Sequence, residues 1–250
     1  MAITDNFGLG GLSPRMLGRM MDGMVSRVVQ DLTSPPIPAG REWAVAIEGF
    51  RSVRVVTSGL IADITQLQAD FRPSPKSWSI AQIIGHLLLS ERMYREQMQR
   101  LIALAREGKA TNVELTLQQV NSSVAFIPRD MMPALEIPLK VFNNFVPRFV
   151  RDAMFRYPLI PASSPAISEP AKSAPIEALR ADLLTSLAAT EAPFGETLPA
   201  NLKGMTVTHP LMGTNNAIEL LGLMGAHEER HQTQINAIKS NADYPRNLVL

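Results

Sequence analysis

The segment from Ser79 to Lys109 constrains the fold most, because it carries the start, the body and the end of one long helix. Ser79 and Gln82 have the spacing of a capping box, in which both side chains bond free backbone amides at a helix start. Apolar residues then recur at helical spacing as far as Ala105. Residues 107–109, Glu-Gly-Lys, indicate the helix end. The sequence therefore predicts a long amphipathic helix here.

Other segments repeat this pattern. Apolar stripes predict helices over residues 41–70, from about 175 to 190, and from about 216 onwards. The last of these begins with Asn-Ala-Ile-Glu at residues 216–219, which resembles a second capping box. A methionine-rich stripe over residues 13–32 predicts a further helix that packs on the main domain or on a partner. Together these segments predict an all-α fold.

The longest interruption is the proline-rich stretch from 110 to 175. Eight prolines fall between residues 128 and 170, so any helices there must be short. The most helical portion carries Arg148 and Arg151, which have two interpretations. They belong to a solvated basic face, or to a lid whose arginines bind an anionic group of a cofactor or substrate. Residues 193–213 are expected to form a long connection.

Composition excludes several classes of function. The formal net charge of the 250 residues is +1, which gives no indication of a nucleic-acid partner. The chain has no cysteine, so disulfides, thiolate metal ligands and a cysteine nucleophile are excluded. No apolar run is long enough to span a bilayer, and the first residues do not resemble a secretory signal. We therefore expect a cytoplasmic protein with no membrane partner.

The chain has only four histidines, and three of them are candidate metal ligands. His227 and His231 stand at i and i+4, which places them one turn apart on one helix face. They are either solvated surface residues or a pair that grips one divalent ion. His86 lies among apolar residues of another predicted helix, either as a core residue or as a third ligand. His209 is interpreted as a cap or loop residue, with a catalytic role as the alternative.

Three histidines without cysteine predict a site with an open coordination position, as in catalytic zinc centres. Imidazole suits zinc, nickel, iron or copper, of which we expect zinc or nickel. Gln234, one turn after His231, is placed to orient an imidazole or move a proton.

Residues 227–231 also match HExxH, in which Glu228 would be the general base of a hydrolase. The 19 residues after His231 contain neither the glutamate nor the histidine that the familiar zinc proteases use as third ligand.

Two stretches resemble signatures of the DinB-like (YfiT-type) superfamily. Residues 78–87, which contain His86, are similar to its second-helix signature, and residues 208–213 followed by 227–235 are similar to its C-terminal signature. The resemblance covers roughly residues 41–240. It implies an up-down-down-up four-helix bundle with a long crossover, and a divalent metal held by His86, His227 and His231. Residues 1–40 would then be an N-terminal extension, 110–175 an insertion and 241–250 a tail.

The resemblance also implies a range of activities. Characterised relatives include metal-dependent transferases and isomerases that use low-molecular-weight thiols such as bacillithiol, mycothiol or glutathione. We therefore expect a metal-dependent enzyme acting on a small molecule, such as a thiol-dependent S-transferase. The alternatives are a non-catalytic metal- or ligand-binding stress protein and a metal-assisted hydrolase that uses Glu228. A homodimer formed through bundle faces is a further expectation.

Overall fold

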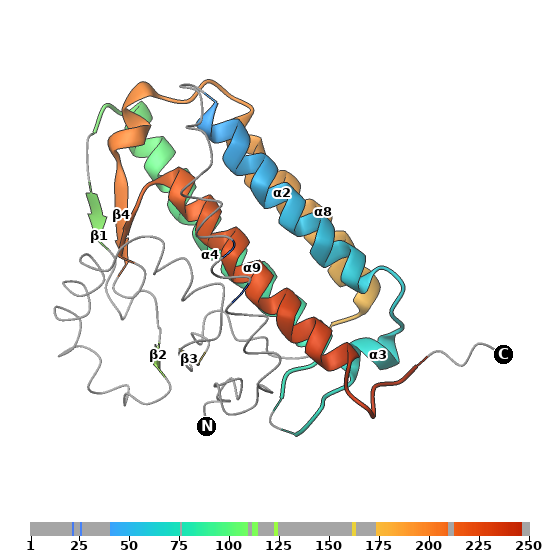
Figure 1. The fold of residues 1–250 in the computed structure, drawn as a ribbon. Coiled ribbons are helices and arrows are strands. Elements are labelled where there is room, and N and C mark those ends of the chain that lie inside the picture. Colours follow the sequence, from blue (N-terminus) through green and yellow to red (C-terminus); the bar gives the residue numbers. More distant parts are fainter. Residues whose placement is uncertain are drawn as a thin grey trace.

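The structure is a computed structural model, and it describes residues 41–75, 77–109, 112–114, 174–209 and 213–246, together with residues 22, 26, 123–124 and 162–163 (Figure 1). The predicted N-terminal helix over 13–32 and the helical portion of the proline-rich insertion lie outside these residues, apart from residues 22 and 26.

Four long helices form the body of the molecule: α2 (Glu42–Ile61), α4 (Ile80–Arg106), α8 (Ile176–Glu191) and α9 (Ala217–Lys239). Helix α2 packs against α8 and α9, and α4 packs against the same two helices on the other side. Figure 1 shows α2 and α9 running in one direction and α4 and α8 in the other. The order along the chain is therefore up-down-down-up, with the long crossover between α4 and α8, as predicted.

The predicted helix starts are confirmed in detail. Ser79 caps α4 and Asn216 caps α9, each through a complete capping box that also uses Gln82 or Glu219. Helix α4 ends at Arg106, and Gly108 follows with φ of +70°, a conformation that glycine adopts without steric cost.

The prediction of one helix over 41–70 is wrong, because α2 ends at Ile61 and a separate short helix, α3 (Gln66–Asp70), follows. Thr65 caps α3 with its own capping box, which takes the chain out of the helical conformation between the two elements. The last carbonyls of α2 are satisfied from other helices. Arg180 donates to the carbonyl of Ile61 and Lys239 to that of Leu60, and Arg180 also donates to the carbonyl of Ile64 in the link between α2 and α3.

The long connection predicted over 193–213 contains short regular elements. Two short 3₁₀ helices, η4 (Ala192–Phe194) and η5 (Ala200–Gly204), lead into strand β4 (Thr206–His209). Strand β4 pairs in parallel with β1 (Asn112–Glu114) and antiparallel with β5 (Gly213–Asn215), which leads directly into α9. Two-residue strands β2 (Ser123–Val124) and β3 (Ala162–Ser163) form a second, antiparallel pair.

The core divides into two apolar clusters along the bundle. One surrounds Met98, Leu101 and Leu221, and the other surrounds Ile61, Ile84 and Ile235. The levels between these clusters carry buried polar side chains from all four long helices. These side chains are those of Arg54, Thr57, His86, Ser90, Glu91, Ser186, Thr190, Glu228, His231 and Gln234. The polar middle of the bundle is therefore the place to look for chemistry.

Within the described residues, every helix is too short or too polar to cross a membrane.

Candidate metal centre

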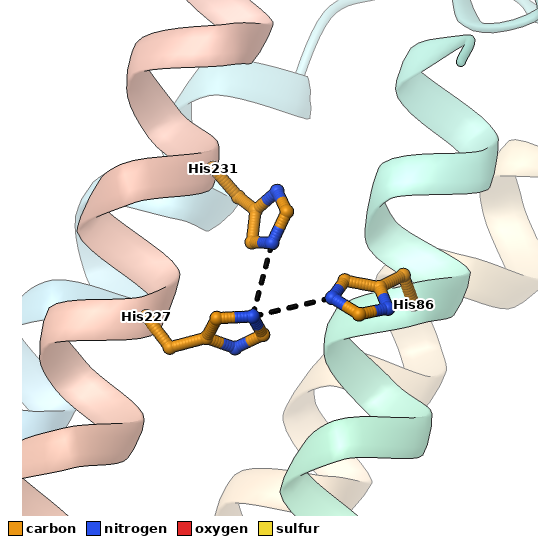
Figure 2. A group of neighbouring side chains, drawn as sticks. All are labelled: His86, His227 and His231. Atoms are coloured by element: carbon orange, nitrogen blue, oxygen red, sulfur yellow. Dashed lines mark hydrogen bonds between the residues drawn. The ribbon is translucent and has the colours of Figure 1, made fainter. Parts of the chain in front are cut away.

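The three predicted ligands meet between α4 and α9. Figure 2 shows His86 projecting from α4 toward His227 and His231, which stand one turn apart on α9. The Nε2 atom of His227 lies 3.2 Å from that of His86 and 3.1 Å from that of His231. One potential ligand atom from each residue falls within 4.8 Å of the others. Sequence reasoning therefore identified the members of this cluster correctly.

The spacing of these nitrogen atoms fits a shared metal ion. Two imidazole nitrogens bound to one tetrahedral zinc, each about 2.0–2.1 Å from it, lie about 3.3 Å apart. Hydrogen bonding explains the arrangement less well, because one imidazole Nε2 carries either a single proton or a single lone pair in the ring plane. His227 Nε2 nevertheless faces two other Nε2 atoms at once. Three lone pairs directed at one cation would satisfy all three rings.

Gln234 fixes the proton of one ligand. Its Oε1 atom lies 2.6 Å from Nδ1 of His231, and an amide oxygen only accepts hydrogen bonds. The proton of neutral His231 is therefore on Nδ1, which leaves the Nε2 lone pair free to bind a metal. The amide nitrogen of Gln234 is buried without a hydrogen-bond partner among the described residues. The structure thus places Gln234 beside the site, as predicted, while its catalytic role stays a prediction.

The electrostatic environment keeps two of the ligands neutral. Burial, followed by the charges of neighbouring His86 and Arg230, lowers the pKa of His227 well below its ordinary value. Burial also lowers the pKa of His231, and the charges of the other two histidines lower it further. The hydrogen bond that His231 donates to Gln234 raises this pKa and opposes the decrease. Neutral imidazole is the form that binds metal. Both rings are therefore held in the competent state at neutral pH.

The surroundings restrict how the site is used. His86 and His231 are buried, whereas His227 keeps partial exposure. The indole of Trp78 lies against His86 with ring centroids 5.0 Å apart, which holds that imidazole from the side of the α4 start. In the part of the chain that the structure describes, no carboxylate joins the three histidines in the cluster. An ion held here would keep at least one position open to a small molecule.

A buried ion-pair network occupies the same level of the bundle. Arg54 of α2, only 1% exposed, donates from Nε and Nη2 to both carboxylate oxygens of Glu228, at distances from 2.9 to 3.2 Å. Its Nη2 also donates to Glu91 of α4 at 2.7 Å, and its Nη1 to the Leu183 carbonyl of α8 at 2.8 Å. Thr190 donates to the other oxygen of Glu91. One guanidinium thus connects all four long helices.

The carboxylates of Glu228 and Glu91 stabilise the positive charge of Arg54. Burial alone would lower the pKa of Arg54, but its bonds to Glu228 and Glu91 outweigh that effect and raise the pKa. Sequence reasoning missed Arg54. The signal was present, since Arg54 interrupts the buried stripe of α2 that runs through Phe50, Thr57 and Ile61.

Glu228 was predicted as a general base, and the structure gives its carboxylate other partners. Both oxygens are engaged by Arg54, and Glu228 is 2% exposed. Adjacent residues on a helix point in directions about 100° apart, so Glu228 and His227 project differently from α9. The catalytic role of Glu228 stays a prediction, and these contacts favour a structural role instead.

Three further residues singled out from the sequence are Arg148, Arg151 and His209. Arg148 and Arg151 lie outside the described residues, so their binding role stays a prediction. His209 is the last residue of β4.

Comparison with models of protein families shows which family the chain belongs to. The model of the DinB superfamily matches residues 50–235, which include α4, α9 as far as Ile235 and all three clustered histidines. The chain belongs to the DinB superfamily. The matched range lies inside the predicted bundle of residues 41–240, while the outer domain boundaries stay predictions. Comparisons with curated proteins and with solved structures give no significant match, so no relative supplies a reaction.

Proposed function

We propose that this DinB-superfamily chain binds one divalent metal through His86, His227 and His231 and is an enzyme that joins a low-molecular-weight thiol to an electrophile. The observation that carries the proposal is the convergence of three Nε2 atoms, two of them 3.1–3.2 Å from the third, on rings that burial keeps neutral. The donor set contains nitrogen alone, which suits zinc or nickel.

The number of ligands favours catalysis over a purely structural metal. Structural zinc is usually closed by four protein ligands, whereas catalytic zinc keeps a position for water or substrate. A bound divalent ion would supply Lewis acidity that lowers the pKa of a thiol or water at that position. Among the residues that the structure describes, the cluster has three histidines and no carboxylate, so a bound ion would keep its full positive charge, which favours an anionic partner such as a thiolate.

The protein's own residues have separable tasks in this proposal. Gln234 holds the proton on Nδ1 of His231, so that Nε2 stays available. Trp78 fixes the His86 ring. His227 alone is partly exposed, and we infer that substrates reach the centre on its side.

The nucleophile would come from outside the chain, because the protein has no cysteine. In the proposed reaction the sulfur of the thiol forms a bond to the electrophilic carbon. The leaving group departs with the electrons of its own bond, and the thiol proton passes to solvent. Arg148 and Arg151 are proposed to bind a carboxylate of the thiol. We place the activity in the cytoplasm, where such thiols are kept reduced.

The experiment compares metal-loaded wild type with His231→Ala, using glutathione, bacillithiol and mycothiol in turn with an activated aryl halide. Mass spectrometry of the product then reports whether the thiol has been added. A thiol-dependent, metal-dependent adduct that the variant does not form is the expected result. Metal binding without any adduct would favour the non-catalytic binding protein. Turnover of an ester without thiol would favour the hydrolase.

A further inference from the structure

The outer face of α2 carries a regular stripe that no described element covers. Its seven members are all exposed and follow one another at spacings of four or three residues. The five members within α2 therefore lie on one side of the helix, whereas Arg41 is its N-cap residue and Asp63 follows its last residue by two positions. The seven members are Arg41, Val45, Gly49, Ser52, Val56, Gly59 and Asp63. Val45 and Val56 are 44% and 52% exposed, so two large apolar side chains face solvent here.

The stripe is complementary to itself when read backwards. If two copies of α2 lie antiparallel with Ser52 at the crossing point, each Val45 is level with the partner's Gly59, and each Val56 lies one residue, about 1.5 Å along the axis, beyond the level of the partner's Gly49. A Cβ added at Gly49 or Gly59 would have no heavy atom within 4 Å, so both positions are open gaps in the surface. Each valine of one copy would therefore enter a gap left by a glycine of the other.

The ends of the stripe add charge complementarity. In the same antiparallel register Arg41 of one copy is level with Asp63 of the other, at both ends of the interface. Neither side chain has an ion-pair partner among the described residues of its own chain. Parallel pairing would instead place like residues together, valine on valine and arginine on arginine.

We propose that this stripe binds a second copy of the chain, forming a twofold dimer in which the two α2 helices pack antiparallel about Ser52. A twofold axis requires each contact to occur twice, and the sequence order of the stripe meets that requirement. Small residues at the crossing allow close approach of the two helix axes, to about 8–10 Å. One helix from each copy makes a small interface, so the dimer forms at micromolar concentrations and above.

Cysteine crosslinking tests the register directly, because the natural chain has no cysteine. At axis separations of about 8–10 Å, the two Ser52 Cα atoms are about 3–5 Å apart, which overlaps the range of about 4.4–6.8 Å in which disulfides form. Ser52→Cys should therefore give a covalent dimer on mild oxidation with diamide. Val45→Cys is the matched control, because the two copies of that position are about 21 Å apart along the axis.

Analytical ultracentrifugation of the full chain, over micromolar to hundreds of micromolar, supplies the second test. We expect a dimer in the wild type, a monomer in Val56→Arg, a weakened dimer in Arg41→Asp and recovery in the double variant Arg41→Asp with Asp63→Arg. Because the substituted side chains are exposed, we expect helix content to be unchanged in these variants, and circular dichroism checks this. A monomeric wild type at every concentration overturns the proposal. Equal crosslinking of Ser52→Cys and Val45→Cys, or no rescue by the charge exchange, overturns the antiparallel register.

Discussion

Replacing Arg54 with methionine tests the role of the buried ion-pair network most sharply. The substitution keeps an unbranched side chain in the core but removes every hydrogen bond that the guanidinium donates to Glu228, Glu91 and the Leu183 carbonyl. Two buried carboxylates, from α4 and α9, are then left without their shared cation. Both carboxylate side chains are at most 3% exposed, so water cannot replace the lost partner without opening the bundle.

The expected cost follows from this burial. Removing one partner of a buried ion pair typically costs about 3–5 kcal/mol, because the remaining charge is uncompensated. Total stabilities of about 5–15 kcal/mol are usual, so Arg54→Met should remove a large share of the free energy of unfolding. Arg54→Lys should cost less but still destabilise, since an ammonium group cannot match the planar fork that serves both carboxylates.

The assay is urea denaturation of the metal-free protein at pH 7.5, followed by far-ultraviolet circular dichroism. The control is the triple variant Arg54→Met, Glu91→Gln and Glu228→Gln, in which neither buried carboxylate remains. This variant should recover a substantial part of the loss. The reasoning is refuted if Arg54→Met unfolds within about 0.5 kcal/mol of the wild type, which is the ordinary effect of a surface change. It is also refuted if the triple variant is no more stable than the single one.

Three further predictions concern the histidine cluster and a helix cap. Gln234→Leu removes the hydrogen-bond acceptor at Nδ1 of His231 and should weaken metal affinity about 10–100-fold, whereas Gln234→Glu should retain the affinity. Competition with a chelator measures both affinities. Wild-type affinity in Gln234→Leu would contradict the role of this hydrogen bond. The lowered pKa of His227 and His231 means that the unfolded chain takes up protons below the ordinary pKa of 6.5 while the folded chain does not. The two histidines therefore do not reduce the unfolding free energy of the metal-free protein above pH 6.5, and this free energy falls as the pH drops below 6.5. A flat dependence of the unfolding free energy on pH in acid titrations would count against neutral histidines. The double variant His227→Gln with His231→Gln should flatten this dependence. Ser79→Ala removes the α4 cap and should cost about 1 kcal/mol in thermal unfolding, whereas the exposed Thr185→Ala should cost far less.

The parts of the fold that sequence could predict are those fixed by local chemistry. The starts of α4 and α9 were predictable because Ser79 and Asn216 satisfy helix amides with their own neighbours. The break after Ile61 was missed because the apolar stripe continues through it, and the cap at Thr65 was not recognised. Strands β4 and β5 were missed because they are only four and three residues long, and because the pairing of β4 with β1 joins residues about ninety positions apart. Non-local pairing leaves little signal in a short stretch of sequence.

The same distinction applies to the site. His227 and His231 are related by helix geometry, so their proximity was predictable from spacing alone. His86 was a candidate third ligand beside a core interpretation, and the family resemblance favoured the ligand, because no local rule connects it with residues 141 positions later. The partners of Glu228 could not be predicted from the sequence for the same reason. Its place in HExxH suggested chemistry, but its orientation depends on Arg54, which is 174 residues away along the chain.

The central claim is that three histidines form one metal site, and elemental analysis of the purified, tag-free protein tests it most directly. His227→Ala should abolish bound metal, whereas His209→Ala, which changes the one histidine outside the cluster, should retain it. The account predicts close to one divalent transition-metal ion per chain in the wild type and in His209→Ala, and none in His227→Ala. Absence of metal from the wild type after reconstitution with zinc or nickel, or full occupancy in His227→Ala, would contradict it.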